Sequence, residues 1–91
     1  MRKEDVRSSV QSDFDELEEG HVIHHIFPGS RRRLCEKYGY LYRVTPYIHK
    51  LIHDYPNDGL DLMLKQTAQK HFETHHGNRE DFIREFGRSY L

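Results

Sequence analysis

The shortness of this chain is what most constrains its fold. A chain of 91 residues forms one small domain, and it buries roughly 60 to 65% of its unfolded surface, so its core is thin. A bound metal ion or a partner chain would therefore help to stabilise it. No apolar run approaches the roughly 18 residues of a membrane span. No apolar stretch follows the N-terminal Met-Arg-Lys, so we expect no signal peptide either.

The charge distribution and the cysteine content indicate which kind of partner and which redox compartment to expect. Residues 1–20 carry three basic and seven acidic side chains, whereas residues 21–91 carry eleven and eight. We interpret residues 1–19 as a flexible acidic N-terminal arm, and the mildly basic remainder as suited to an anionic partner. The single cysteine, Cys35, excludes an internal disulfide and a CxxC zinc knuckle. A reducing, intracellular setting fits best.

The hydrophobic pattern predicts two short strands separated by a loop. The β-branched and aromatic residues of HVIHHIF (21–27) indicate a strand that ends at Pro28-Gly29. The segment YLYRVT (40–45) alternates like a second strand, with Tyr40, Tyr42 and Val44 on one face. Between them, RRRLCEKYG is expected to form a helical turn that stops at Gly39.

Three helices are expected after the second strand. Thr45-Pro46 is a strong helix start, and that helix should run to about His53. Asp58, with Asp61 as its reciprocal partner, should cap the next helix, and Asn78 the last one. The apolar residues predicted to face the core from these helices are Tyr47, Ile48, Leu51, Ile52, Leu60, Met63, Leu64, Ala68, Phe72, Phe82, Ile83, Phe86 and Tyr90.

Histidine is the over-represented residue, with eight copies where average usage gives about two. His49 and His53 are four residues apart on the predicted helix, so they share one edge of it. A strand antiparallel to the one that feeds this helix can add His24, which makes three neutral imidazoles and a metal site with open positions. Adjacent strand residues point to opposite faces, so His25 should not bind the same ion. A free histidine beside a metal is suited to be a general base.

Two segments resemble the HNH endonucleases, the ββα-metal nucleases. HHIFPGS (24–30) looks like their D/H-H-I-x-P-x-S element, and TPYIHKLIH (45–53) like the end of their second strand and their ligand helix. The all-histidine set is similar to the colicin-type branch. Residues 60–91 resemble the C-terminal part of small HNH nucleases carried by phages and prophages, so the resemblance covers residues 21–91.

The resemblance implies both a fold and an activity. The fold is α+β, a small ββα-metal core over about residues 20–55 with two additional C-terminal helices over about residues 58–91, together one HNH-like nuclease domain (20–91). The activity is metal-dependent endonucleolytic hydrolysis of DNA phosphodiester bonds in the cytoplasm of a bacterium or a phage-infected host cell. DNA is the expected partner, no membrane is involved, and a homodimer is left open.

The resemblance also assigns roles to residues. His25 would be the general base that activates water. One divalent ion (zinc, nickel, manganese or magnesium) would stabilise the transition state and the leaving group, and its ligands would be His24, His49 and His53. The flanking phosphates would be bound by Arg31, Arg32 and Arg33. The middle asparagine of the family has no counterpart in YGYLYRVTP (38–46), so the orientation of His25 is expected to depend on a backbone carbonyl.

A different class of protein fits the same histidines. A non-catalytic, zinc-stabilised module that binds DNA or protein would fill the fourth coordination position with His25 or Cys35. A third reading is an interaction domain that has lost its metal. His25 separates the first two readings, because a nuclease leaves it free and a closed structural site consumes it. We expect His71, His75 and His76 to be structural, because they lie in the last turn of a helix.

Overall fold

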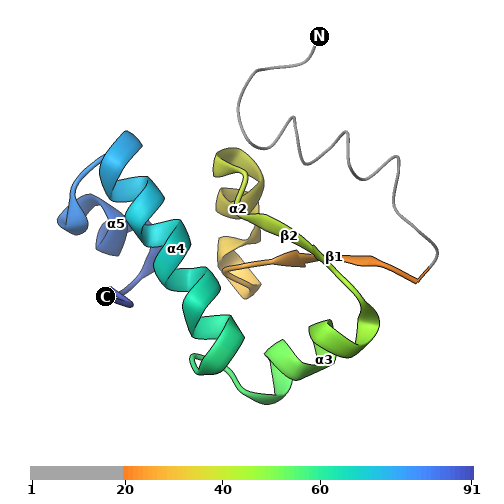
Figure 1. Ribbon diagram of the computed structural model, residues 1–91. Helices are drawn as coiled ribbons and strands as arrows, with labels where there is room; N and C mark the ends of the chain where they lie inside the picture. Colours follow the sequence, from red (N-terminus) through yellow and green to blue (C-terminus); the bar gives the residue numbers. More distant parts are fainter. Residues whose placement is uncertain (1–19) are drawn as a thin grey trace, which may run out of the picture.

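The computed structural model describes residues 20–91 and has the predicted α+β architecture (Figure 1). The predicted arm, residues 1–19, lies outside the described residues. The elements in chain order are β1 (Val22–His25), the 3-10 helix η1 (Gly29–Arg31), α2 (Arg32–Tyr38), β2 (Leu41–Val44), α3 (Pro46–Asp54), α4 (Gly59–His75) and α5 (Arg79–Phe86). The predicted fold class, two strands and a helix followed by two further helices, is confirmed. None of the helices in this part of the chain is long and apolar enough to cross a membrane.

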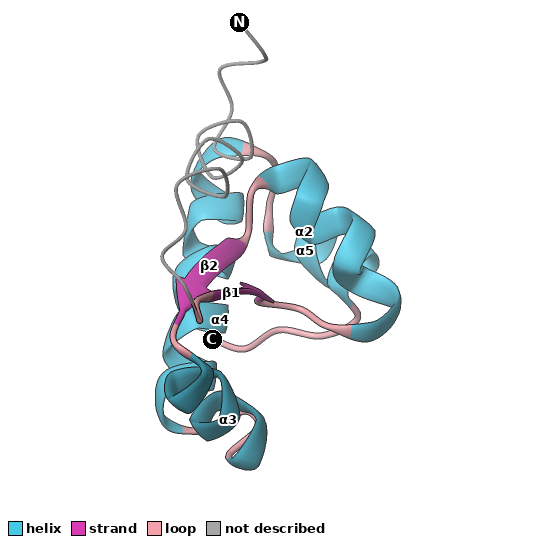
Figure 2. Cartoon of the chain, turned by 90° about the vertical axis from the view of Figure 1, so that its right-hand side faces the viewer, coloured by secondary structure: helices cyan, strands magenta, loops and turns pink. Residues whose placement is uncertain are grey.

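The sheet is a short antiparallel ribbon in which His24 of β1 lies opposite Tyr42 of β2. The alternation predicted for β2 is only partly right. Leu41 and Val44 are both buried, whereas Tyr42 and Arg43 are exposed. Residues three apart on a strand point to opposite faces, so packing elements cover parts of both faces of the ribbon. Figure 2 shows helices on more than one side of it.

Side-chain caps determine where α3 and α5 begin. The Thr45 hydroxyl accepts a hydrogen bond from the backbone N–H of Ile48 at 3.2 Å, and Pro46 takes the first helical position. Asn78 and Asp81 form a complete capping box at the start of α5. Each cap satisfies backbone donors that have no partner within the helix. These helix starts agree with the sequence prediction.

Asp61 differs from its predicted role as the reciprocal partner of Asp58. Its carboxylate instead accepts a hydrogen bond from the backbone N–H of Asn57 at 2.6 Å. It also forms an ion pair of 3.0 Å with Lys65, and both side chains are buried. Lys65 in turn donates to the Asn57 side-chain oxygen at 2.8 Å. This buried polar cluster therefore ties the turn between α3 and α4 to α4 itself.

The core is built from aromatic rings that join the loop after β1 to α4 and α5. The ring centroid of Phe27 lies 4.6 Å from that of Phe86 and 5.7 Å from that of Phe82. Phe72 of α4 lies 5.5 Å from Phe82 in an edge-to-face arrangement, which contributes beyond buried area alone. The buried apolar residues are Ile26, Phe27, Cys35, Tyr40, Leu41, Val44, Ile52, Leu64, Ala68, Phe72, Phe82 and Phe86.

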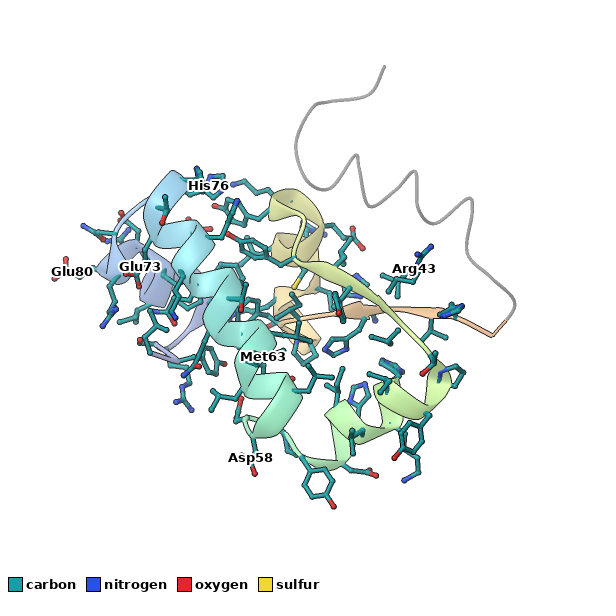
Figure 3. All side chains as sticks on the ribbon, in the orientation of Figure 1. Arg43, Asp58, Met63, Glu73, His76 and Glu80 are labelled. Carbon is teal, nitrogen blue, oxygen red and sulfur yellow. The ribbon has the colours of Figure 1, made fainter. Side chains whose placement is uncertain are left out.

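Four residues predicted to face the core are exposed instead, namely Tyr47, Leu51, Met63 and Ile83. Among the residues of α3, only Ile52 is fully buried. A chain this short has little material with which to cover a helix on more than one side, so α3, α4 and α5 keep part of their apolar residues at the surface. Figure 3 shows the side chains on the ribbon, with Met63 labelled on α4.

Candidate metal centre

Helix α3 presents two histidines to the same point in space. His49 and His53 are one turn apart, and their ring centroids lie 4.4 Å from each other. Their Nε2 atoms are separated by 3.1 Å. The Thr45 cap and Pro46 fix the residue at which α3 begins. Because residues four apart are neighbours on a helix surface, both imidazoles lie on the same side of α3. One rigid element therefore supplies two potential ligand atoms.

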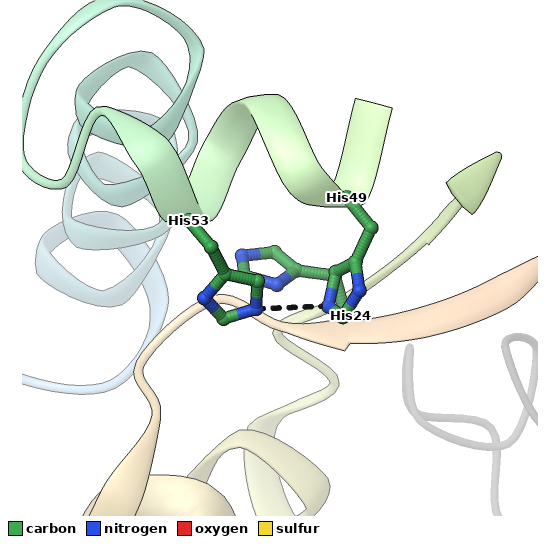
Figure 4. Close-up of side chains that lie close together, drawn as sticks. All are labelled: His24, His49 and His53. Atoms are coloured by element: carbon green, nitrogen blue, oxygen red, sulfur yellow. Dashed lines mark hydrogen bonds between the residues drawn. The ribbon is translucent and has the colours of Figure 1, made fainter. Parts of the chain in front are cut away.

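Strand β1 adds the third imidazole. The ring of His24 lies edge-on to both others, with centroid distances of 5.4 Å to His49 and 5.7 Å to His53. One nitrogen from each ring can be chosen so that all three lie within 4.8 Å of one another. Figure 4 shows the three side chains gathered between α3 and β1. The structure thus brings together the three residues predicted as ligands, and metal binding itself stays a prediction.

The donor set fits a divalent ion. Nitrogen ligands about 2.0 to 2.1 Å from a tetrahedral ion lie roughly 3.3 to 3.4 Å from one another. The 3.1 Å between the Nε2 atoms of His49 and His53 is close to that spacing, and a nitrogen of His24 lies within 4.8 Å of both ligand atoms. The Nε2 atom of His24 is buried and has no hydrogen-bond partner. An orphaned buried nitrogen costs about 1 to 3 kcal/mol, which coordination would offset.

Burial keeps the first candidate ligand neutral. The pKa of His24 falls to about 4, chiefly because the ring is buried; His49, His53 and His25 contribute to the same shift, whereas Asp61 opposes it. Burial, followed by the charge of His53, also lowers the pKa of His49. Metal ions bind the neutral form of imidazole. Protons therefore compete with a metal at His24 less than they would at an exposed histidine.

His25 lies beside the cluster but turns to a different partner. Its Nε2 atom lies 3.2 Å from the Glu36 carboxylate of α2, and 15% of the His25 side chain is exposed. The expected backbone carbonyl is therefore replaced by a carboxylate. Glu36 had no signal in the sequence, because it belongs to no motif and reaches His25 only through the packing of α2.

These histidines line one cavity. Its volume is about 300 Å³, which is the size of a small-molecule site. It is lined by Ile23, His24, His25, Pro28, Gly29, Arg32, His49 and His53. The three candidate ligand histidines, His25 and Arg32 thus line the same cavity.

The three arginines predicted as a unit are separated by the fold. Arg32 lines the cavity of the candidate metal centre. Arg31 lines a different cavity on the other side of Pro28. Arg33 is exposed on α2 and lines neither of the two. The turn from η1 into α2 points consecutive side chains in different directions, which is the reason for the difference.

The other histidines and Cys35 lie outside the cluster. His71 and His75 repeat the four-residue spacing, with ring centroids 4.4 Å apart, but His71 Nδ1 lies 3.0 Å from the Tyr40 hydroxyl. Within residues 20–91, only His24, His49 and His53 form a group of three potential ligands. Cys35 is fully buried, and its sulfur exchanges hydrogen bonds with the backbone of Phe27.

Comparison of the chain with protein-family models, with curated proteins and with solved structures finds no match in any of the three. The resemblance to HNH endonucleases therefore depends on the motifs and on the geometry described above.

The depressed pKa of His24 predicts how the stability of the metal-free protein depends on pH. The ordinary pKa of the imidazole is 6.5, and in the folded chain it falls to about 4. On acidification the unfolded state gains this proton first, so the free energy of unfolding should decrease between about pH 6.5 and pH 4. The upper bound on this loss is about 3 kcal/mol.

Urea denaturation in the presence of EDTA across this pH range measures the effect. His24→Gln removes the titrating group, so its stability should depend less steeply on pH between these limits. A His24→Gln profile as steep as that of the parent would show that the burial of this imidazole does not control the acid response.

Proposed function

We propose that the protein is a metal-dependent endonuclease of the HNH type that hydrolyses DNA phosphodiester bonds. The observation that carries the proposal is the composition of one cavity. Three histidines there converge as potential metal ligands, while a fourth, His25, lines the cavity outside that group. Arg32 lines the same cavity and offers a fixed positive charge to a phosphate. A ligand set, a free base and an anion-binding side chain are the groups that phosphodiester hydrolysis requires.

The roles of the protein's own residues follow from these contacts. A carboxylate can only accept hydrogen bonds, so the contact with Glu36 places the proton of neutral His25 on Nε2. Nδ1 then keeps the lone pair that accepts a proton from the attacking water. Arg32 would hold a nonbridging phosphate oxygen in the cavity. A divalent ion bound by the three ligand histidines would stabilise charge on the phosphoryl oxygens and on the leaving 3′ oxygen.

The alternative of a closed zinc module receives less support from the geometry. Such a site needs a fourth protein ligand. His25 directs its Nε2 atom to Glu36, and Cys35 is engaged with the backbone of Phe27 in the core. Burial also raises the pKa of the Cys35 thiol to about 11, which disfavours the thiolate that a metal requires. A site with open coordination positions, as in a catalytic centre, therefore fits better.

A nicking assay tests the proposal directly. Supercoiled plasmid and a labelled single strand are incubated with the metal-stripped protein and added Zn²⁺, Ni²⁺, Mn²⁺ or Mg²⁺. We expect cleavage with at least one ion and none in EDTA. Absence of cleavage of both substrates with every ion, by protein that binds the metal, would contradict the nuclease proposal and favour the non-catalytic module.

Glu36 should act as a positioning residue for His25. Glu36→Ala should lower kcat on the order of 10-fold, the lower end of what partners of catalytic-site histidines contribute. KM and metal affinity should stay unchanged, because Glu36 contacts neither the ligands nor the phosphate. Glu36→Gln keeps an acceptor oxygen and should recover part of the rate. The matched control is Glu80→Ala on the exposed side of α5, and equal rates for Glu36→Ala and this control would contradict the role.

A further inference from the structure

A second cavity lies on the other side of Pro28 from the candidate metal centre. Its volume is about 260 Å³, and Pro28 lines both cavities, so the two are neighbours. Its lining combines cationic, hydroxyl and aromatic side chains: Phe27, Pro28, Ser30, Arg31, Lys65, Phe86 and Tyr90. The roles proposed above use none of these residues except as structural support.

The guanidinium of Arg31 is held in place without an acidic partner among residues 20–91. Its Nη1 atom donates to the Ser30 hydroxyl at 2.7 Å. Its Nη2 atom packs against Gly87, where an added Cβ would lie only 2.7 Å away. The Nε atom is buried without a hydrogen-bond partner, and Arg31 forms no ion pair with the carboxylates of residues 20–91. A fixed guanidinium with unused donors is suited to bind an oxyanion such as a phosphate.

The cavity lining also contains aromatic rings and a second cation. The Lys65 ammonium lies 5.3 Å from the centroid of the Tyr90 ring, and the Arg88 guanidinium lies 4.6 Å from it. Asp61 neutralises part of the charge of Lys65, so among the lining residues Arg31 supplies most of the excess positive charge. Arg88 does not line the cavity and adds its charge from beside the Tyr90 ring. Aromatic rings beside cations are what proteins use to hold single-stranded nucleic acid, with the ring against a base and the cation against the backbone.

We infer that this second cavity receives an unpaired nucleotide next to the scissile phosphate, with its phosphate on Arg31 and its base or sugar against Tyr90. The inference rests on the proposed nuclease function and specifies its substrate as single-stranded DNA, or as DNA with an unpaired end. A paired base is stacked inside the duplex and cannot enter such a cavity without leaving the stack. The volume of about 260 Å³ is comparable to that of one nucleotide unit and much smaller than that of a base-paired segment.

Binding without cleavage tests the inference. Fluorescence anisotropy in EDTA compares a labelled single strand with a hairpin duplex of the same sequence. We expect the parent to bind the single strand roughly tenfold more tightly, the effect of one base stacked on an aromatic ring. Arg31→Gln and Tyr90→Leu should each lose most of this preference. Arg33→Gln, the matched control, should weaken both complexes equally and keep the preference.

A modified oligonucleotide locates the contact. Methylphosphonate linkages, which are neutral, are placed one at a time along the single strand. We expect one position at which the methylphosphonate linkage lowers the affinity of the parent for the single strand. At that position it should not lower the affinity of Arg31→Gln. If circular dichroism shows that Arg31→Gln does not fold, the single-strand preference of Tyr90→Leu is compared with that of the parent instead. Equal affinity of the parent for single strand and hairpin, or the absence of any position-specific loss, would overturn the inference.

The two proposals can fail separately. A single-strand preference that depends on Arg31, in a protein that cleaves nothing with any ion, would support the cavity and contradict the nuclease. Metal-dependent cleavage by a protein that binds single strand and duplex equally would support the nuclease and overturn the cavity.

Discussion

His25→Ala is expected to lower the rate of phosphodiester hydrolysis by about 10² to 10⁴-fold, the contribution of a positioned general base. Metal stoichiometry, DNA affinity and the melting temperature should stay close to those of the parent. The reason is that His25 lines the cavity without belonging to the ligand group. Single-turnover nicking rates, with metal content measured on the same samples, give the result.

Two comparisons test whether the loss of activity in His25→Ala reflects the loss of a general base. A ligand variant such as His53→Ala should lose metal and activity together, whereas His25→Ala should lose activity alone. The zinc-module alternative expects the reverse for His25→Ala, with weaker metal binding and lower stability. A His25→Ala protein that cleaves as fast as its parent would show that His25 is not the base, even with the fold and the metal site intact.

The parts of the site that could be predicted are those that local sequence determines. Thr45 and Pro46 define the start of α3 through backbone chemistry. The spacing of His49 and His53 then places both rings on one side of a helix, whatever the rest of the chain does. His24 required one further step, the antiparallel pairing of the two strands. These three inferences used only the spacing of residues within one element and the pairing of two neighbouring strands.

The parts that could not be predicted depend on tertiary packing. Glu36 reaches His25 because α2 folds back onto β1, and no spacing rule links residues eleven apart in different elements. Arg31 and Arg32 are adjacent in sequence, yet they line different cavities, because the turn from η1 into α2 points their side chains in different directions. The exposed Tyr47 and Met63 fit an amphipathic pattern, but a thin core leaves parts of both helices uncovered.

Metal binding is expected to have the largest effect on stability. An ion that binds only the folded state stabilises it by about 2.7 kcal/mol at a concentration 100 times its Kd. For a domain of this size, that corresponds to a rise of roughly 10 to 20 °C in Tm. Differential scanning fluorimetry with EDTA, and then with Zn²⁺ or Ni²⁺, measures the shift. An unchanged Tm at saturating concentrations of both ions would contradict the metal site.

Variants of the three ligands should remove this rise, and the chain contains its own control. His24→Ala, His49→Ala and His53→Ala each leave two donors, so the metal-induced shift in Tm should largely disappear.

His71→Ala and His75→Ala are the controls, because they change a pair with the same four-residue spacing and the same 4.4 Å between ring centroids. His71→Ala should lower the starting Tm, because His71 contacts the Tyr40 hydroxyl. The metal-induced shift should nevertheless be retained in both controls, since neither residue belongs to the three-histidine group. Its loss in the controls as well would show that exposed histidine pairs, and not the convergence of β1 and α3, bind the ion.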